Sequence, residues 1–172
     1  KDYKQAAAWW RKAAEQGDEI GQYNLGYMYE NGYGVLKDEK QAASWYLKAA
    51  DQGNATALGK IYYLGKGVLK DDKKAVDWYR KAAEHGAVDA QVELGFMYEN
   101  GYGVLKDYNQ AAAFYRKAAE QGDAKAQYHL GIMYENGYGV LKDHNQAVAW
   151  YKKSANQGDA GAQYNLGIMF DK

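Results

Sequence analysis

The sequence predicts an all-α protein, a solenoid of tandem helix–turn–helix repeats. The segment Met-Tyr-Glu-Asn-Gly-Tyr-Gly-Val-Leu-Lys-Asp occurs three times unchanged, beginning at Met28, Met97 and Met133. A glycine also ends each of five alanine-rich segments, at spacings of 36, 33, 36 and 36 residues. These glycines are Gly17, Gly53, Gly86, Gly122 and Gly158. Periods of this length are typical of stacked helical pairs, and 20 glycines with no proline suit helices separated by glycine turns.

One helix of each pair, here called helix B, combines aromatic residues with small alanines. Its first copy has Ala6, Trp9, Trp10, Ala13 and Ala14 at the i, i+3, i+4, i+7, i+8 spacing of an amphipathic helix. Further copies begin at Ala42, Ala75, Ala111 and Ala147. We expect the rings to pack against alanine surfaces of neighbouring helices.

The other helix of each pair, helix A, has a glycine in its interior. In the third repeat Ala90, Leu94, Met97 and Tyr98 share one face, and Gly95 follows the leucine. The same position holds Gly26, Gly59, Gly131 and Gly167 in the other copies. A glycine inside a helix costs about 1 kcal/mol relative to alanine. Its recurrence therefore predicts a close helix–helix contact that a side chain would obstruct.

The sequence predicts a single repeat domain, residues 1–172, and capping residues mark the repeat units within it. Short polar residues stand where each helix should begin, and Asp107 followed by Gln110 resembles a capping box. The predicted caps are Asp2, Asp38, Asp71, Asp107 and Asp143 for helix B, and Asp18, Asn54, Asp123 and Asp159 for helix A. The predicted units are a helix B at 2–16, repeats at 18–52, 54–85, 87–121 and 123–157, and a final helix A at 159–171. Because Lys1 falls within a repeat, we expect the chain to be a piece of a longer array.

The second repeat differs from the others. Three residues are missing between Gly53 and the Leu58-Gly59 pair, which corresponds to about 4.5 Å of helix. This predicts a helix A shortened at its start, with a change of curvature or a notch near residues 54–64.

Composition argues against several functions. Lys plus Arg equals Asp plus Glu, at 22 each, whereas a nucleic-acid-binding protein usually has a basic surplus or stripe. No apolar run approaches the roughly 18 residues of a membrane span. The chain has no cysteine, and His85, His129 and His144 lie in different repeats, so we expect no metal site, no cofactor and no enzymatic activity.

Two local patterns have simpler structural explanations. The glycines at Gly32 and Gly34 follow a predicted helix and lack the remaining residues of a phosphate-binding loop, so a turn is expected. The glutamates Glu30, Glu99 and Glu135 recur once per repeat, too far apart for an acid–base pair, and are predicted to form a polar ladder.

The repeat pattern as a whole resembles the Sel1-like repeat family. The third copy carries it in Ala90, Leu94, Gly95, Tyr98, Gly101, Gly103, Val104, Asp107, Ala111, Phe114, Tyr115, Ala118, Ala119 and Gly122. The resemblance covers essentially the whole chain. It implies a right-handed α-α superhelix related to tetratricopeptide repeats, and scaffold or adaptor roles, often in bacterial envelope, secretion or host-interaction settings. The chain departs from relatives with disulfide-linked repeats, because it has no cysteine.

In solenoids of this kind helices A line the concave surface, and the resemblance thereby indicates a partner-binding face. Its candidate residues mix apolar side chains with asparagine, which suits an extended peptide whose backbone amides need hydrogen-bond partners. They are Asn24, Tyr27, Asn31, Glu93, Phe96, Asn100, His129, Ile132, Asn136 and Asn165, with Ile168 beside them. Packing of Tyr27, Phe96, Ile132 and Ile168 against the next repeat is an equally open interpretation.

The leading functional hypothesis is a non-catalytic scaffold that binds a protein or peptide. The alternative is a cell-envelope polysaccharide bound through exposed aromatic rings. RNA binding is disfavoured by the charge balance, and membrane insertion is not expected. The exposed ends of the array, including Trp9, Trp10, Met169 and Phe170, predict end-to-end self-association. No targeting segment lies within the chain, so envelope, secreted and cytoplasmic locations stay open.

Overall fold

The computed structural model describes residues 2–65 and 68–171. Ten α-helices and no strands lie within these residues. The helices are α1 Tyr3–Glu15, α2 Glu19–Asn31, α3 Glu39–Asp51, α4 Ala55–Leu64, α5 Asp72–Glu84, α6 Val88–Asn100, α7 Tyr108–Glu120, α8 Ala124–Asn136, α9 His144–Asn156 and α10 Ala160–Phe170. Odd-numbered helices are the predicted helices B and even-numbered ones the predicted helices A. The predicted all-α, helix–turn–helix class is confirmed.

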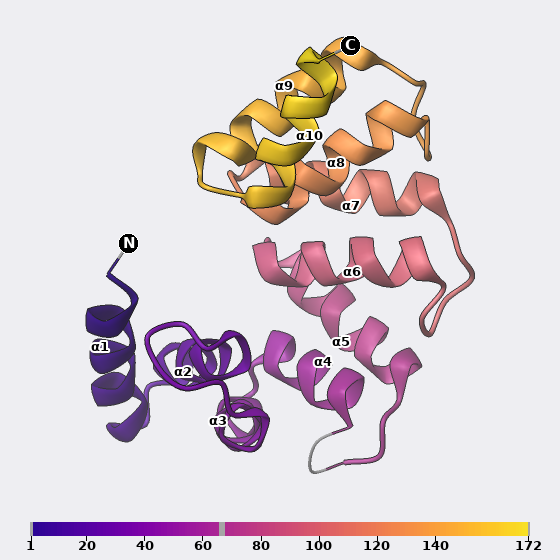
Figure 1. The fold of residues 1–172 in the computed structure, drawn as a ribbon. Helices are drawn as coiled ribbons and strands as arrows, with labels where there is room; N and C mark the ends of the chain where they lie inside the picture. The colour runs from indigo at the N-terminus through magenta and orange to yellow at the C-terminus, as the bar shows by residue number, and fades with distance from the viewer. Residues whose placement is uncertain (1, 66–67, 172) are drawn as a thin grey trace. The chain divides into compact units, whose positions relative to one another are not determined.

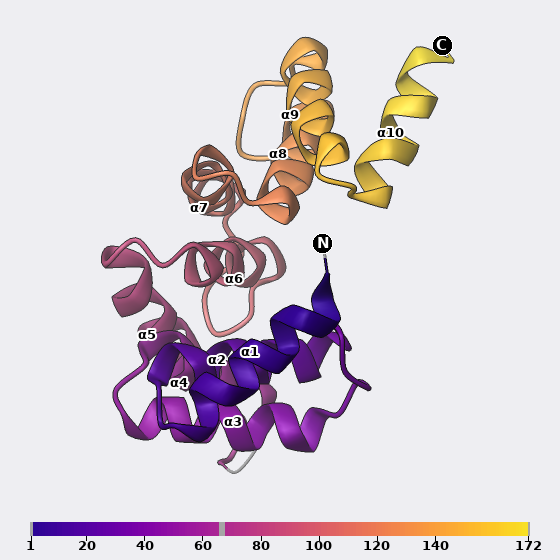
Figure 2. The same cartoon turned by 90° about the vertical axis from the view of Figure 1, so that its left-hand side faces the viewer.

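The chain forms two compact units, Lys1–Ala82 and Ala83–Lys172, and each is described by itself. Within a unit each helix folds back beside the next one along the chain. Figures 1 and 2 show this for α1, α2 and α3 in the first unit, and for α8, α9 and α10 in the second.

The predicted caps hold the helix starts. The Asp18 carboxylate accepts a hydrogen bond from the Gly21 N–H at 2.6 Å, and Asp107 accepts from the N–H groups of Asn109 and Gln110. Asp2, Asp38, Asn54, Asp71, Asp123, Asp143 and Asp159 make equivalent bonds. Each bond satisfies an N–H group that the first helical turn leaves unpaired. Helix α6 is an exception, because Ala87 at its cap position has no side chain to accept such a bond.

The recurring glycine of helix A gives the next helix B room to approach. A Cβ atom placed on Gly95 would lie 2.6 Å from Cδ1 of Tyr115, well inside van der Waals contact. The same clash arises between Gly26 and Tyr46, Gly59 and Tyr79, and Gly131 and Tyr151. All four tyrosines have no solvent exposure. The predicted close contact is confirmed at these four glycines, and its partner is the tyrosine of the helix B aromatic pair. It is absent at Gly167 of α10, which has no atom within 4 Å of an added Cβ.

Three of the four buried tyrosine hydroxyls bond to the recurring glutamates, whereas the second repeat, which contains Tyr79, has Tyr63 at the glutamate position. The Tyr115 hydroxyl donates to Glu99 Oε2 at 2.7 Å, and Tyr46 and Tyr151 donate to Glu30 and Glu135 at the same distance. An unsatisfied buried hydroxyl would cost about 1–3 kcal/mol. The glutamates predicted as a polar ladder are therefore acceptors that allow a tyrosine to occupy the core.

The predicted shortening of the second repeat is confirmed. Helix α4 has 10 residues, whereas α2, α6 and α8 each have 13. Asn54 still caps it, accepting from the Ala57 N–H at 2.8 Å. The change of curvature or notch near residues 54–64 stays a prediction.

We expect Gly95→Ala to lower the free energy of unfolding by about 2 kcal/mol, because the added methyl group overlaps the enclosed Tyr115 ring. Chemical denaturation measures this change.

The matched control is Gly167→Ala, at the same repeat position but with no atom within 4 Å of the added Cβ. It should leave stability unchanged or raise it by up to about 1 kcal/mol, through helix propensity alone. Equal destabilisation by the two substitutions would contradict the packing explanation.

Candidate functional site

The predicted binding residues lie on four helices A. Helix α2 of the first unit holds Asn24, Tyr27 and Asn31. In the second unit the predicted residues are Glu93, Phe96 and Asn100 on α6, His129, Ile132 and Asn136 on α8, and Asn165 on α10. The glycine–tyrosine packing fixes the sets on α2, α6 and α8, whereas Gly167 on α10 has no atom within 4 Å of an added Cβ.

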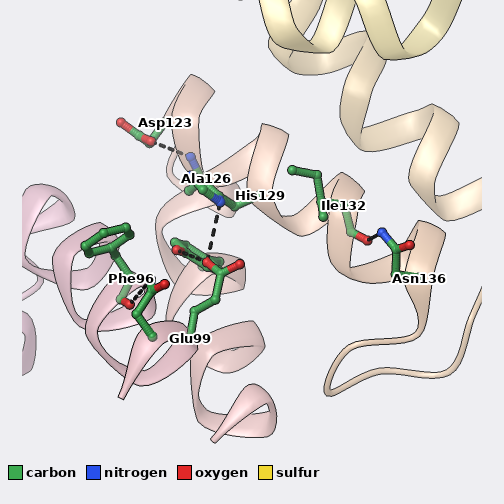
Figure 3. A network of polar contacts seen from close by, with 9 residues as sticks. Phe96, Glu99, Asp123, Ala126, His129, Ile132 and Asn136 are labelled. Carbon is green, nitrogen blue, oxygen red and sulfur yellow. Dashed lines mark hydrogen bonds and ion pairs between the residues drawn. The ribbon is translucent and has the colours of Figure 1, made fainter. Parts of the chain in front are cut away.

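Four of the five candidate asparagines bond to their own helices, whereas Asn165 hydrogen-bonds the Tyr151 side chain; the sequence did not predict these bonds. Nδ2 of Asn31, Asn100 and Asn136 donates to the carbonyl oxygen four residues earlier, at 2.8–2.9 Å. Figure 3 shows this bond between Asn136 and Ile132. Asn24 makes the same type of bond to Ile20. Each bond uses one of the two amide N–H groups, so the amide is held in one orientation and its oxygen and second N–H take no part in this bond.

The apolar candidates are partly exposed and partly packed. The Tyr27 ring lies 6.0 Å from Tyr33, and Phe96 lies 5.7 Å from Tyr102. Ile132 packs against the cluster that contains Tyr151. These side chains therefore contribute to packing and still present part of their surface to solvent.

His129 belongs to a polar network with Glu99 and Tyr115. Figure 3 shows the contact between His129 and Glu99. Its Nδ1 lies 3.6 Å from Glu99 Oε2, the oxygen that also accepts the Tyr115 hydrogen bond. The His129 ring stacks on Tyr115 with centroids 4.7 Å apart and planes 8° apart, while Tyr128 contacts it edge-on. Only 31% of the side chain of this predicted binding residue is exposed.

Burial sets the protonation of this network. Desolvation lowers the pKa of His129 from its usual value, while the carboxylates of Glu99, Asp159 and Asp123 act in the opposite direction. Burial also raises the pKa of Tyr115, and the neighbouring Glu99 charge adds to that shift. The imidazole and the phenol of this network are therefore neutral at neutral pH. The network can exchange hydrogen bonds with a ligand, but its carboxylate is already engaged by the tyrosine.

The first unit has a related network that sequence reasoning missed. Lys60 on α4 lies 3.3 Å from Glu30 Oε1, and Tyr46 donates to the other oxygen of the same carboxylate. Only 8% of the Lys60 side chain is exposed. Lys60 follows Gly59 just as Tyr27 follows Gly26 and Phe96 follows Gly95. An alignment of the repeats on this glycine would therefore have placed the lysine on the predicted binding face.

Within residues 2–65 and 68–171, no three His, Asp or Glu side chains converge in a way that could hold a metal ion. Over the same part of the chain, none of the helices combines the length and apolarity needed to cross a membrane.

The stacked helical pairs define a helical-repeat protein, and comparison with known families identifies which kind. The Sel1 repeat model matches residues 1–18, 20–54, 55–86, 88–123, 124–159 and 160–172. The chain belongs to the Sel1 repeat family. Proteins of this family are generally non-catalytic scaffolds.

Solved structures agree with this assignment. A Sel1 repeat protein from Oxalobacter formigenes is 41% identical, with a TM-score of 0.74 over 99% of this chain and 71% of that one. A protective antigen of uropathogenic Escherichia coli strains that displays an SLR fold is 42% identical, with a TM-score of 0.70 over 98% of this chain. An immunity protein from Pseudomonas aeruginosa is 27% identical, with a TM-score of 0.62 over 94% of this chain and 61% of its own.

The chain spans 37% of the length of the Escherichia coli antigen. No curated protein sequence matches it significantly.

We expect an NMR titration to place the pKa of His129 below about 6.5, and Glu99→Gln to lower it further by removing the opposing carboxylate. A folded-state pKa below the unfolded value means that the unfolded chain binds more protons as the pH falls. Acidification from pH 7 to pH 5 should therefore destabilise the wild type more than His129→Asn. A pKa above 6.5, or one unaffected by Glu99→Gln, would contradict this electrostatic account.

Proposed function

We propose that the chain is a non-catalytic scaffold that binds a protein or peptide along the exposed face of its helices A. One observation carries the proposal. Glu93, His129 and Asn165 occupy the same repeat position on α6, α8 and α10, two residues before the recurring glycine. A fixed backbone therefore presents an acid, an imidazole and an amide in succession, as a surface that recognises a particular partner requires.

The local geometry supports a peptide ligand. Asparagines held by their own helices lose little conformational freedom when they bind, which lowers the entropic cost of recognition. Phe96 and Ile132 add partly exposed apolar surface beside them. A peptide backbone with alternating side chains can use both kinds of contact.

Binding also fits the chemistry better than catalysis does. Glu99 accepts a hydrogen bond from Tyr115, and Glu135 accepts one from Tyr151. Glu30 is shared between Tyr46 and Lys60. These carboxylates are committed to the fold, whereas a general base must be able to reach a substrate proton.

The polysaccharide alternative finds less support on this face. Sugar stacking requires an open ring face, but Tyr27 and Phe96 are partly covered, and Tyr46, Tyr79, Tyr115 and Tyr151 are fully enclosed. More open rings occur elsewhere, with exposures of 66% for Trp9, 70% for Tyr164 and 67% for Phe170. End-to-end association through such rings stays a prediction.

A pull-down from lysates of source cells and candidate host cells tests the proposal. The bait variant carries Asn24→Ala, Glu93→Ala and His129→Ala. We expect at least one protein captured by the wild type to be lost from this variant, because all three substitutions remove polar groups from the helix A face.

The control carries Glu15→Ala, Asn109→Ala and His144→Ala, the same residue types at exposed positions on helices B. It should capture the partner as the wild type does, once circular dichroism shows that all baits are folded. Equal capture by the three baits, or capture of glycan alone, would overturn the proposal.

A further inference from the structure

A second surface lies at the junction of α1, α2 and the loop that leads to α3, and it uses none of the residues proposed above. It is a shallow hollow of about 550 Å³ lined by Arg11, Tyr29, Val35, Leu36, Lys37, Asp38 and Gln41.

Two oriented donors meet in this hollow. Nη2 of Arg11 donates to the Tyr29 hydroxyl oxygen at 2.6 Å, so the phenol proton must point elsewhere. Within the part of the chain that the structure describes, neither the remaining Arg11 N–H groups nor this phenol proton has a protein acceptor. Guanidinium and phenol donors side by side match the two oxygens of a carboxylate.

The charge of the hollow also favours an anion. Arg11 and Lys37 are positive, and Asp38 is the single acidic residue among the lining side chains. The Asp38 carboxylate already accepts from the backbone N–H groups of Lys40 and Gln41 at 2.9 and 3.0 Å. It therefore caps α3 and forms no ion pair with Arg11 among the described residues.

Leu36 gives the hollow an apolar rim. Its exposed fraction is 90%, although nothing in the fold requires a large apolar side chain there. The loop that carries it is firmly held. The Asp38 N–H donates to the Tyr29 carbonyl at 3.0 Å, the Tyr33 ring stacks on Tyr3, and a Cβ on Gly34 would overlap the Tyr3 carbonyl. The exposed leucine and the two donors thus form a preorganised set.

The second unit repeats the arrangement independently. Nη2 of Arg116 donates to the Tyr134 hydroxyl at 2.6 Å, and Leu141 in the adjoining loop is 90% exposed. The Asp143 N–H donates to the Tyr134 carbonyl at 2.9 Å, and Tyr138 stacks on Tyr108. Arg80, the equivalent arginine on α5, instead contacts the carboxylate of Asp77 at 3.3 Å. The structure therefore contains two arginine–tyrosine pairs and one arginine that already has a carboxylate.

We propose that the Arg11–Tyr29 hollow, and its counterpart at Arg116 and Tyr134, each bind a peptide segment in which a carboxylate side chain stands next to a large aliphatic residue. The carboxylate accepts from the guanidinium and the phenol, and the aliphatic side chain lies against Leu36 or Leu141. Two contributions then favour binding. The peptide carboxylate accepts hydrogen bonds from oriented donors, and the exposed leucine surface is removed from water.

The probe is the blocked peptide acetyl-Gly-Ser-Glu-Leu-Gly-Ser-amide, titrated into ¹⁵N-labelled protein. We expect shifts of the backbone amides of Arg11, Tyr29 and residues 35–41, and of their counterparts around Arg116 and Tyr134. The matched peptide with Gln in place of Glu should bind at least about tenfold more weakly, because it lacks the charge that strengthens both hydrogen bonds.

Variants assign the effect to residues. Arg11→Gln should abolish the shifts in the first unit and leave those around Arg116 intact, so the second unit reports on folding in the same sample. Leu36→Ser, at a residue with almost no packing, should weaken the first site without changing stability. Arg80→Gln serves as the control and should change neither site.

Equal binding of the Glu and Gln peptides, or no shift at millimolar peptide, would overturn the proposal. So would shifts confined to the helix A residues Glu93, His129 and Asn165. Sedimentation with phosphatidylglycerol vesicles in the absence of any peptide shift would also overturn it, by assigning the leucines and lysines of the loops to a lipid surface.

Discussion

The fold depends on the contact between a glycine of helix A and a tyrosine of the following helix B. Without a Cβ atom on Gly95, the Tyr115 ring can reach the backbone of α6, and its hydroxyl then meets Glu99 at 2.7 Å. Burial of the ring stabilises the pair, while the hydrogen bond prevents the hydroxyl from opposing that burial. Since the contact recurs between Gly26 and Tyr46, Gly59 and Tyr79, and Gly131 and Tyr151, one interaction sets the spacing of the helical pairs in both units.

This contact also decides which residues are available for binding. In the sequence the recurring glutamates resemble surface groups, yet their carboxylates accept hydrogen bonds from Tyr46, Tyr115 and Tyr151. The proposed recognition surface uses other side chains of helices A, such as Glu93 and His129, of which His129 also stacks on Tyr115. The loops that follow α2 and α8 hold the exposed Leu36 and Leu141, each in the same repeat as an arginine–tyrosine pair. The two proposed surfaces of this chain thus differ in chemistry and share the same helical frame.

The local features of the fold were predictable because they depend on residues a few positions apart. Asp107 caps α7 through neighbours two and three residues on, and the missing residues after Gly53 shorten α4 as expected. Side-chain pairs between helices were not predictable in the same way. Arg11 and Tyr29 are 18 residues apart, and Glu30 and Lys60 are 30 apart. Their pairing depends on how closely the helices approach, which the period alone does not specify. The buried amides of Gln22, Gln91 and Gln127 were missed for the same reason, since each meets a glutamine 30 residues later.

The central claim is that glycine and tyrosine act as one unit. A double-mutant cycle of Gly95→Ala and Tyr115→Leu, followed by chemical denaturation, tests it most directly. The account predicts that Gly95→Ala loses most of its cost once the ring is gone, which corresponds to a coupling energy of at least about 1 kcal/mol. Additive effects of the two substitutions would contradict it, because each residue would then act on stability without the other.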